Sequence, residues 1–325
     1  MTRNASALRQ LLGVALAVAL LGGSPRAVSA QPVDRIRDHI YATFLLNTEK
    51  AWAVGSFGSI YHSADGGRQW ERQDSGYIDP LYGVSFVSEQ EGWISGKSGL
   101  ILHTTDGGNT WQRQTTGTTH HLFNLAFVDA QRGIAVGDYG IVLQTTDGGQ
   151  SWTDRSLGED VFLYGVSMHP SGKVWVAGEM GVILVSEDGG TTWTRRETGA
   201  ESSLLGVGFV DENTVCAVGM DGTIVQSSDS GQTWQRYESP VQTALYNLAL
   251  NGQTGWAVGD EGVILHSTDG GQNWKLFEAP EELALYWMMG LSLSPSDSKG
   301  IIAGSNGLVL HIDGKSIDYG RRFTR

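Results

Sequence analysis

The sequence repeats itself about every 41 residues, and this repeat constrains the fold more than any other feature. A Gly-x-x-Gly pair recurs seven times, with steps of 41, 41, 41, 41, 40 and 45 residues between the first glycines. The pairs are Gly55/Gly58, Gly96/Gly99, Gly137/Gly140, Gly178/Gly181, Gly219/Gly222, Gly259/Gly262 and Gly304/Gly307. Such a regular period indicates an architecture in which each unit packs against its neighbours.

Each unit is expected to contain four short β-strands. In the second unit they are expected at residues 82–87, 92–95, 100–103 and 110–114, which are rich in β-branched and aromatic residues and separated by turn formers. Units of this length with four strands are typical of propeller blades. A sandwich or solenoid is the alternative, but closing a ring removes the sheet edges that those folds expose. The sequence therefore predicts an all-β fold, a seven-bladed β-propeller with Asp-box turns.

Six units carry an Asp-box between the third and fourth strands, with the pattern S/T-x-D-x-G-x-x-W. Its members are Asp65 and Trp70, Asp106 and Trp111, Asp147 and Trp152, Asp188 and Trp193, Asp229 and Trp234, and Asp269 and Trp274. We expect the aspartate to cap backbone N–H groups, the glycine to permit positive φ, and the tryptophan to supply apolar surface. The seventh unit keeps only Asp313-Gly314, so residues 316–319 or the segment before His39 could supply its outer strand.

The run Gly96-Lys-Ser-Gly-Leu-Ile-Leu-His-Thr-Thr-Asp-Gly-Gly-Asn-Thr-Trp111, and its equivalent from Gly259 to Trp274, resemble a known family. It is the photosystem II assembly/stability factor family, with its related exported bacterial Asp-box (BNR-like) propellers. The resemblance covers residues 40–311 and implies a non-enzymatic assembly factor. Photosynthetic members hold newly made reaction-centre subunits in the lumen. By resemblance, the expected partner is therefore a membrane protein or its precursor.

The N-terminus reads as a secretory signal peptide. Arg3 and Arg9 precede the apolar run Leu11–Leu21, and Val28-Ser-Ala30 provides small residues for cleavage before Gln31. Eleven apolar residues are fewer than the roughly 20 that span a bilayer, although an anchor is the competing interpretation. We expect residues 1–30 to be the signal peptide, residues 31–325 to be one propeller, and the location to be periplasmic, secreted or, in a photosynthetic source, the thylakoid lumen.

Charge and cysteine content exclude several functions. Cleavage would remove Arg3, Arg9 and Arg26 but no acid, and so lower the formal net charge from −13 to −16. Nucleic-acid binding needs clustered cations, so we expect none. The single cysteine, Cys216, lies in an apolar strand-like run and is expected to be a buried thiol.

The sequence shows little sign of catalysis, and we predict that the protein is not an enzyme. The arginines that a sialidase would need near the axis follow the repeat tryptophans, which places them on the outer strands; they are Arg72, Arg113, Arg155, Arg195 and Arg236. The six aspartates are read as turn residues, since each turn lacks the further acids of a calcium loop. We expect no cofactor and no metal. A carbohydrate-binding or glycoside-hydrolase-like propeller is the rival class, and it would need two axis-facing carboxylates.

The turn residues inside the Gly-x-x-Gly pairs vary on a constant scaffold, as binding residues do. The partner-binding candidates are Phe57, Asp138, Tyr139, Glu179, Met180, Asp221, Asp260 and Glu261. They predict an acidic face with apolar side chains, suited to a basic or polytopic protein, or else simply solvated turns. A second ring, at Tyr41, Tyr82, Phe123, Tyr164, Leu205 and Tyr246, is interpreted as packing between blades or as a contact at the channel mouth.

Overall fold

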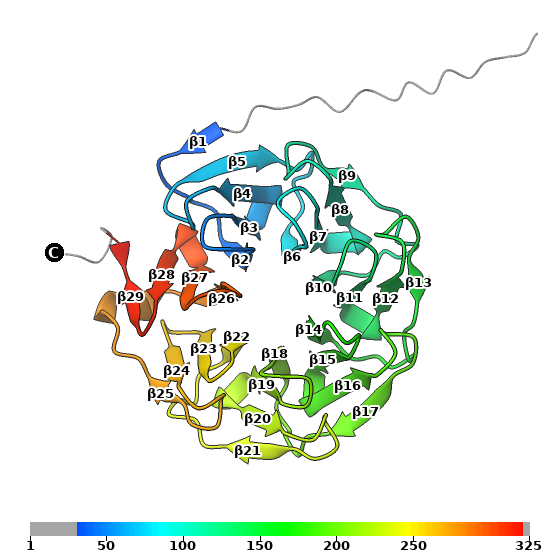
Figure 1. Ribbon diagram of the computed structural model, residues 1–325, viewed down its shortest axis with the longest axis vertical. Coiled ribbons are helices and arrows are strands. Elements are labelled where there is room, and N and C mark those ends of the chain that lie inside the picture. Colours follow the sequence, from blue (N-terminus) through cyan, green and yellow to red (C-terminus); the bar gives the residue numbers. More distant parts are fainter. Residues whose placement is uncertain (1–30, 321–325) are drawn as a thin grey trace, which may run out of the picture.

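The computed structural model describes residues 31–320, and the predicted signal peptide lies outside them. Seven antiparallel sheets surround a central axis, and within each blade consecutive strands run from the axis outward (Figure 1). The innermost strands are β2 (Ile40–Leu45), β6 (Leu81–Phe86), β10 (Leu122–Phe127), β14 (Leu163–Met168), β18 (Leu204–Phe209), β22 (Leu245–Asn251) and β26 (Met288–Leu293). The predicted seven-bladed β-propeller is confirmed.

The remaining strands follow the same order in every blade. The second strands are β3 (Ala51–Gly55), β7 (Gly92–Gly96), β11 (Gly133–Gly137), β15 (Val174–Gly178), β19 (Val215–Gly219), β23 (Thr254–Gly259) and β27 (Lys299–Gly304). The third are β4 (Ser59–Ser63), β8 (Ile101–Thr104), β12 (Val142–Thr145), β16 (Val182–Ser186), β20 (Ile224–Ser227), β24 (Ile264–Ser267) and β28 (Val309–Asp313). The outer strands are β5 (Trp70–Asp74), β9 (Gln112–Arg113), β13 (Thr153–Asp154), β17 (Thr194–Glu197), β21 (Gln235–Tyr237), β25 (Lys275–Leu276) and β29 (Ser316–Asp318).

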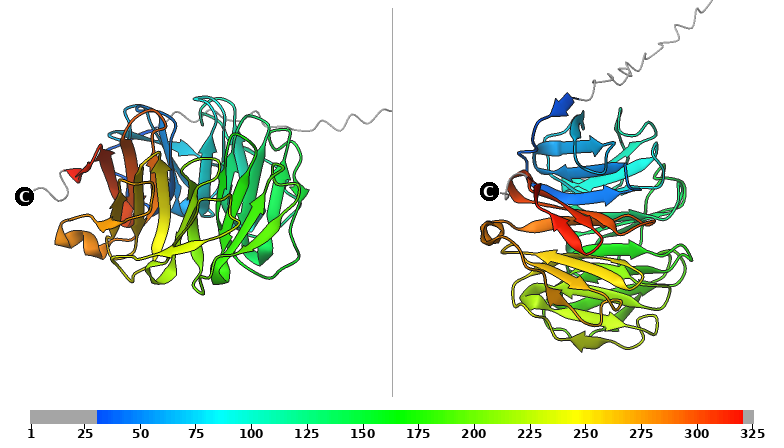
Figure 2. Two further views of the ribbon diagram at one scale, coloured as in Figure 1. Left: turned by 60° about the horizontal axis from the view of Figure 1, so that its bottom comes forward. Right: turned by 60° about the vertical axis from the view of Figure 1, so that its left-hand side comes forward.

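The core lies between neighbouring blades, because the second strands are buried on both faces. β3, β7 and β15 are buried along their whole length. Trp52 and Trp93 stack on Phe86 and Phe127 of the following blades, with ring centroids 3.6 and 3.7 Å apart. Each such pair contributes about 0.5–1.5 kcal/mol beyond its buried area. The blades are therefore locked to each other by aromatic contacts, and viewed obliquely they form a thick disc (Figure 2).

The Asp-boxes have the predicted geometry. In the fourth blade, Asp188 Oδ1 accepts the backbone N–H groups of Thr191 and Thr192 at 3.0 and 2.8 Å. Ser186 Oγ donates to the same carboxylate oxygen and accepts the N–H of Gly190 at 2.7 Å. Hydrogen bonds from the backbone and hydroxyl of Thr192 lower the pKa of Asp188 to about 2. These aspartates are thus committed to their turns.

The two ends of the chain lie in different blades. Residues Ser316–Asp318 form the outer strand β29 of the seventh blade, which decides between the two possibilities left open by the sequence. The other segment, β1 (Gln31–Val33), pairs instead with β5 as a fifth strand of the first blade (Figure 1). The ring is closed by side chains, since the Leu45 N–H donates to Ser292 Oγ at 2.8 Å and Ile36 packs with Ile301.

Two further expectations are met. Of the five arginines, Arg72, Arg113, Arg195 and Arg236 lie on outer strands and Arg155 directly follows the outer strand β13; Arg72 pairs with Asp38 at 3.6 Å. Cys216 is buried, and burial raises the pKa of its thiol to about 12. Within the described part of the chain, no helix has the length and apolarity needed to cross a membrane.

Candidate functional site

The Gly-x-x-Gly turns and the blade-to-blade connections lie together on one side of the disc, which we call the connection face. In the third blade the Gly140 N–H donates to the carbonyl of Val161 in the following connection at 2.6 Å. Gly140 has φ of +66°, and a Cβ there would lie 2.2 Å from the carbonyl oxygen of Glu159. The second glycine is needed because the connection runs directly over it.

The residue before this glycine has a left-handed backbone in all seven turns. These residues are Phe57, Ser98, Tyr139, Met180, Asp221, Glu261 and Asn306, with φ between 52° and 56°. This conformation costs bulky L-residues free energy. Yet Phe57, Tyr139 and Met180 are 70, 57 and 62% exposed. Asn or Gly would form the turn more easily, so the turn itself does not explain these large apolar side chains.

The acids at the preceding position have a structural task. Asp138 Oδ1 accepts the backbone N–H of His121 at 2.7 Å, and Glu179 Oε2 accepts that of Phe162 at 2.9 Å. Ser56 and Ser305 make the equivalent bonds in the first and last blades. Asp138 is only 9% exposed, so the structure places this candidate in the scaffold. This side chain holds the turn against the preceding connection, a role that could not be predicted from the sequence.

Two further acidic candidates form bonds at the surface. The Asp221 carboxylate accepts the hydroxyl of Ser202 at 2.7 Å, and Asp260 Oδ1 accepts the N–H of Glu261 at 2.9 Å. Asp221 and Glu261 are exposed, whereas Asp260 is half-buried. The structure therefore brings the eight candidates to one face, with the apolar ones, Asp221 and Glu261 exposed at its surface.

Exposed apolar side chains concentrate on this face. Eight large ones are exposed within residues 31–320, and seven of these lie in the turns or connections; only Leu276 lies elsewhere, on an outer strand. The seven are Phe57, Ile78, Tyr139, Leu157, Met180, Met220 and Leu285. Single exposed apolar residues need no explanation, but their gathering on one face is typical of an interaction surface.

A pocket of about 410 Å³ lies on the axis and is bordered on the connection face by Met220. Its wall is a ring of one residue per blade: Tyr41, Tyr82, Phe123, Tyr164, Leu205, Tyr246 and Met289. Each is the extra residue of a β-bulge at the start of its innermost strand, where the pairing register shifts. The flanking residues, such as Leu81 and Leu122, are fully buried. The bulge thus turns one side chain per blade toward the axis.

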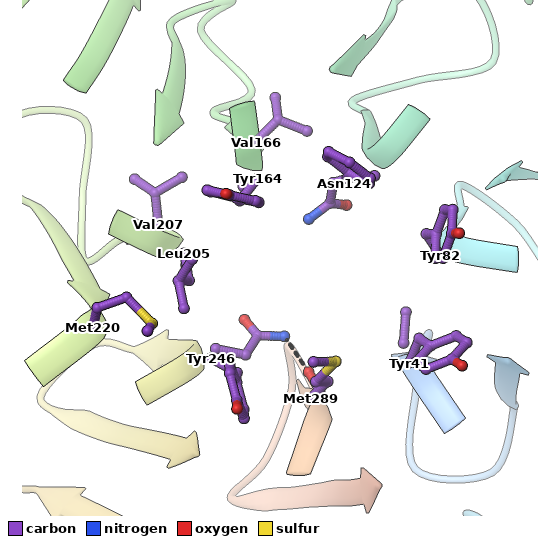
Figure 3. Close-up of a pocket in the computed structure, with 15 residues that line it drawn as sticks. Tyr41, Tyr82, Asn124, Tyr164, Val166, Leu205, Val207, Met220, Tyr246 and Met289 are labelled. Atoms are coloured by element: carbon purple, nitrogen blue, oxygen red, sulfur yellow. Dashed lines mark hydrogen bonds between the residues drawn. The ribbon is translucent and has the colours of Figure 1, made fainter. Parts of the chain in front are cut away.

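The side chains of this ring pack against one another and also line the pocket. Neighbouring rings contact one another, with centroids of Tyr41 and Tyr82, Tyr82 and Phe123, and Phe123 and Tyr164 5.8–5.9 Å apart. Figure 3 shows Tyr41, Tyr82, Tyr164 and Tyr246 around one central space. The Asn247 side-chain amide donates to the Met289 carbonyl at 2.9 Å. Burial and the nearby Glu179 carboxylate raise the pKa of Tyr164 to about 12. The wall carries no acid, lysine or arginine, so it can bind apolar groups and donate tyrosine hydrogen bonds.

Comparison with known proteins gives the family. A sequence model described as "Photosynthesis system II assembly factor YCF48" matches residues 30–119, 111–200 and 196–285. The chain belongs to this family. Among curated proteins, none matches.

Solved structures of YCF48 and of a glycoside hydrolase have a similar fold. One of YCF48 bound to a D1 peptide is 22% identical, with a TM-score of 0.71 over 89% of this chain and 97% of its own. YCF48 from Cyanidioschyzon merolae is 18% identical, with a TM-score of 0.71 over 88% and 99%. A GH74 xyloglucanase from Xanthomonas campestris is 13% identical, with a TM-score of 0.69 over 87% and 53%. Likeness at these identities establishes the propeller fold alone.

The side chains that this YCF48-family chain turns toward the axis are mostly apolar. The seven innermost strands carry no acid and no arginine, as expected from the sequence. Among residues 31–320, no three His, Cys, Asp or Glu side chains gather as metal ligands would. What the connection face offers is a broad apolar and acidic surface around an aromatic pocket.

Proposed function

We propose that this chain is an exported, non-catalytic propeller that holds a membrane protein or its precursor on the connection face during assembly. The observation that carries the proposal is the gathering of seven of the eight exposed large apolar side chains on that face. Membership of a family of assembly factors supports it, as does the fold shared with YCF48 bound to a D1 peptide.

Glycan binding or hydrolysis is the rival class, and the pocket wall argues against hydrolysis. Glycosidases place two carboxylates about the scissile bond. The residues around the pocket include aromatic rings, which sugars could stack on, but no Asp or Glu. Glu179 and Asp260 lie outside this lining, although each raises the pKa of a wall tyrosine, Tyr164 and Tyr246 respectively. Screening the purified protein on a glycan array tests this class directly.

Site-specific photo-crosslinking in the native envelope tests the assembly proposal. A photoreactive amino acid at Tyr139 reports on the connection face, and one at Gln150 is the matched control. Gln150 is exposed in the same blade but lies in its Asp-box turn, on the opposite side of the disc. We expect the Tyr139 probe, and not the Gln150 probe, to capture one membrane protein or its precursor, identified by mass spectrometry.

Two results would overturn the proposal. One is equal capture of the same proteins from both positions, which would mean nonspecific contact. The other is capture of no membrane protein from Tyr139 or from a second probe at Met180, while the glycan array gives a specific ligand.

A further inference from the structure

The acidic residues of the connection face are concentrated on one side of the ring. The turns of blades three to six each contain an acid: Asp138, Glu179, Asp221, and Asp260 with Glu261. The turns of blades seven, one and two contain none, and one holds Lys97, which pairs with Asp79 at 3.3 Å. Most acids of the connections lie on the same side, between blades three and seven: Glu159, Asp160, Glu201, Glu238, Glu281 and Glu282. On the other side, Asp79 and Asp38 are paired with Lys97 and Arg72, whereas on the acidic side Glu159 pairs with Arg195.

Two acids of this side lie next to tyrosines that line the pocket. Besides burial, the Glu179 carboxylate in the fourth blade raises the pKa of Tyr164, and Asp260 in the sixth blade raises the pKa of Tyr246. Glu179 is also held by the Phe162 N–H at 2.9 Å. These two carboxylates are therefore fixed beside the pocket, and they retain acceptor capacity because an ionised carboxylate has about four lone-pair positions.

The fifth blade lies between these two acids, and the residues that it contributes to the pocket are apolar. It contributes Leu205 at the ring position that is aromatic in most blades, together with Met220, Gly206 and Val207. Figure 3 shows Leu205, Val207 and Met220 on one side of the pocket and Tyr41 and Tyr82 across from them. An apolar group entering here would have acids on both flanks of blade five and aromatic faces opposite.

We propose that the axial pocket binds an extended peptide segment. A bulky apolar side chain of the peptide lies inside the ring, and the lysine or arginine residues next to it in the peptide contact Glu179 and Asp260. Charge complementarity indicates that the bound segment is basic, because a cation is attracted both by carboxylates and by the faces of tyrosine rings. The volume of about 410 Å³ lies in the range of 300–1,000 Å³ of ligand pockets. The proposal rests on the proposed function and names the part of the client that is recognised.

The test uses three fluorescent decapeptides that differ only at their centre: Lys-Phe-Arg, Glu-Phe-Glu and Lys-Ser-Arg in a Gly-Ser background. Binding to the purified chain is followed by fluorescence anisotropy. We expect Lys-Phe-Arg to bind at least about tenfold more tightly than either control, with an affinity that falls as salt rises. Equal binding of Lys-Phe-Arg and Glu-Phe-Glu, or no binding of any peptide, would overturn the proposal.

Variants taken from the protein's own repeats locate the peptide without endangering the fold. Leu205→Tyr introduces the residue found at Tyr164 and Tyr246 and narrows the pocket, while Met220→Ser introduces the residue found at Ser56 and Ser305. Glu179→Gln with Asp260→Asn removes charge but keeps hydrogen-bond acceptors. Each is expected to weaken Lys-Phe-Arg binding about tenfold with an unchanged melting temperature. Unchanged affinity in both Leu205→Tyr and Met220→Ser would place the peptide outside the pocket.

The same variants separate this inference from the proposed function. If the Tyr139 probe captures a membrane protein as well from Leu205→Tyr as from the wild type, the pocket is not the recognition site although the scaffold function stands. If Leu205→Tyr weakens peptide binding but no client is captured in the envelope, the pocket stands and the assembly function fails.

Discussion

At the scale of single residues, the left-handed position in each turn separates stability from binding. All seven turns have positive φ there, but only Asp221 and Asn306 belong to residue types that adopt it readily. Phe57, Tyr139 and Met180 retain bulky side chains in this strained conformation and expose them on the connection face. Strain of this kind persists where the side chain serves a function.

Exchanging the residues of two turns tests this interpretation. We predict that Met180→Asn raises the free energy of unfolding by roughly 0.5–1 kcal/mol, a part of the roughly 1–3 kcal/mol that the conformation costs. The reciprocal change, Asn306→Met, should lower it by a similar amount. Urea denaturation measures both. Met180→Asn should also reduce client capture, so unchanged capture by this variant would contradict the proposed binding role.

At the scale of elements, the sequence predicts the turns and strands that recur at a fixed spacing. It does not predict features that depend on how the strands pair in the folded protein. The Gly-x-x-Gly and Asp-box spacings locate the turns after the second and third strands of six blades, so the order of strands in a blade follows directly. The direction of Tyr41 does not follow, because simple alternation ignores the bulge between Ile40 and Ala42. The task of Asp138 was also missed, since its acceptor role depends on His121 being brought beside it by the fold.

The outer strand of the seventh blade gives a prediction at this scale. Ile317 in β29 is 9% exposed and packs with Leu310 and Ile312, whereas Val33 in β1 is half-buried at the edge of the first blade. We predict that Ile317→Ala lowers the free energy of unfolding by about 2–4 kcal/mol, because it leaves a cavity in the core. Val33→Ala should cost less than about 1 kcal/mol. The reverse order in urea denaturation would mean that β1 matters more than β29 to the closed ring.

At the scale of the whole molecule, the repeat places histidines with lowered pKa values at the same position in several blades, so their effects on the pH dependence of stability add up. His62, His103 and His266 occupy the same position in three blades and lie against Trp52, Trp93 and Trp256, and His311 holds this position in the seventh. Burial lowers the pKa of all four below the ordinary 6.5. Blades three and five have Gln144 and Gln226 there, whose amides donate to Gly189 and Gly270 of the next blade.

These depressed pKa values fix the sign of the pH dependence. A histidine in the unfolded chain binds its proton near pH 6.5, while the buried one binds it only at lower pH, so protons favour unfolding. The stabilisation is complete above pH 6.5 and is lost as the pH falls through the folded pKa values. A second loss is expected between about pH 4 and pH 2, because the folded pKa values of Asp188 and Asp229 are about 2.

We therefore predict that the melting temperature, followed by circular dichroism at constant ionic strength, falls from pH 7 to pH 5 and falls again below pH 4. The variant His62→Gln/His103→Gln/His266→Gln/His311→Gln carries the glutamine of blades three and five at every site. It should show a clearly smaller fall between pH 7 and pH 5 and the same fall below pH 4, because its Asp-boxes are intact. An identical profile in the two proteins would mean that the first transition belongs to other groups, and that repetition of the histidine position does not set the acid stability of the ring.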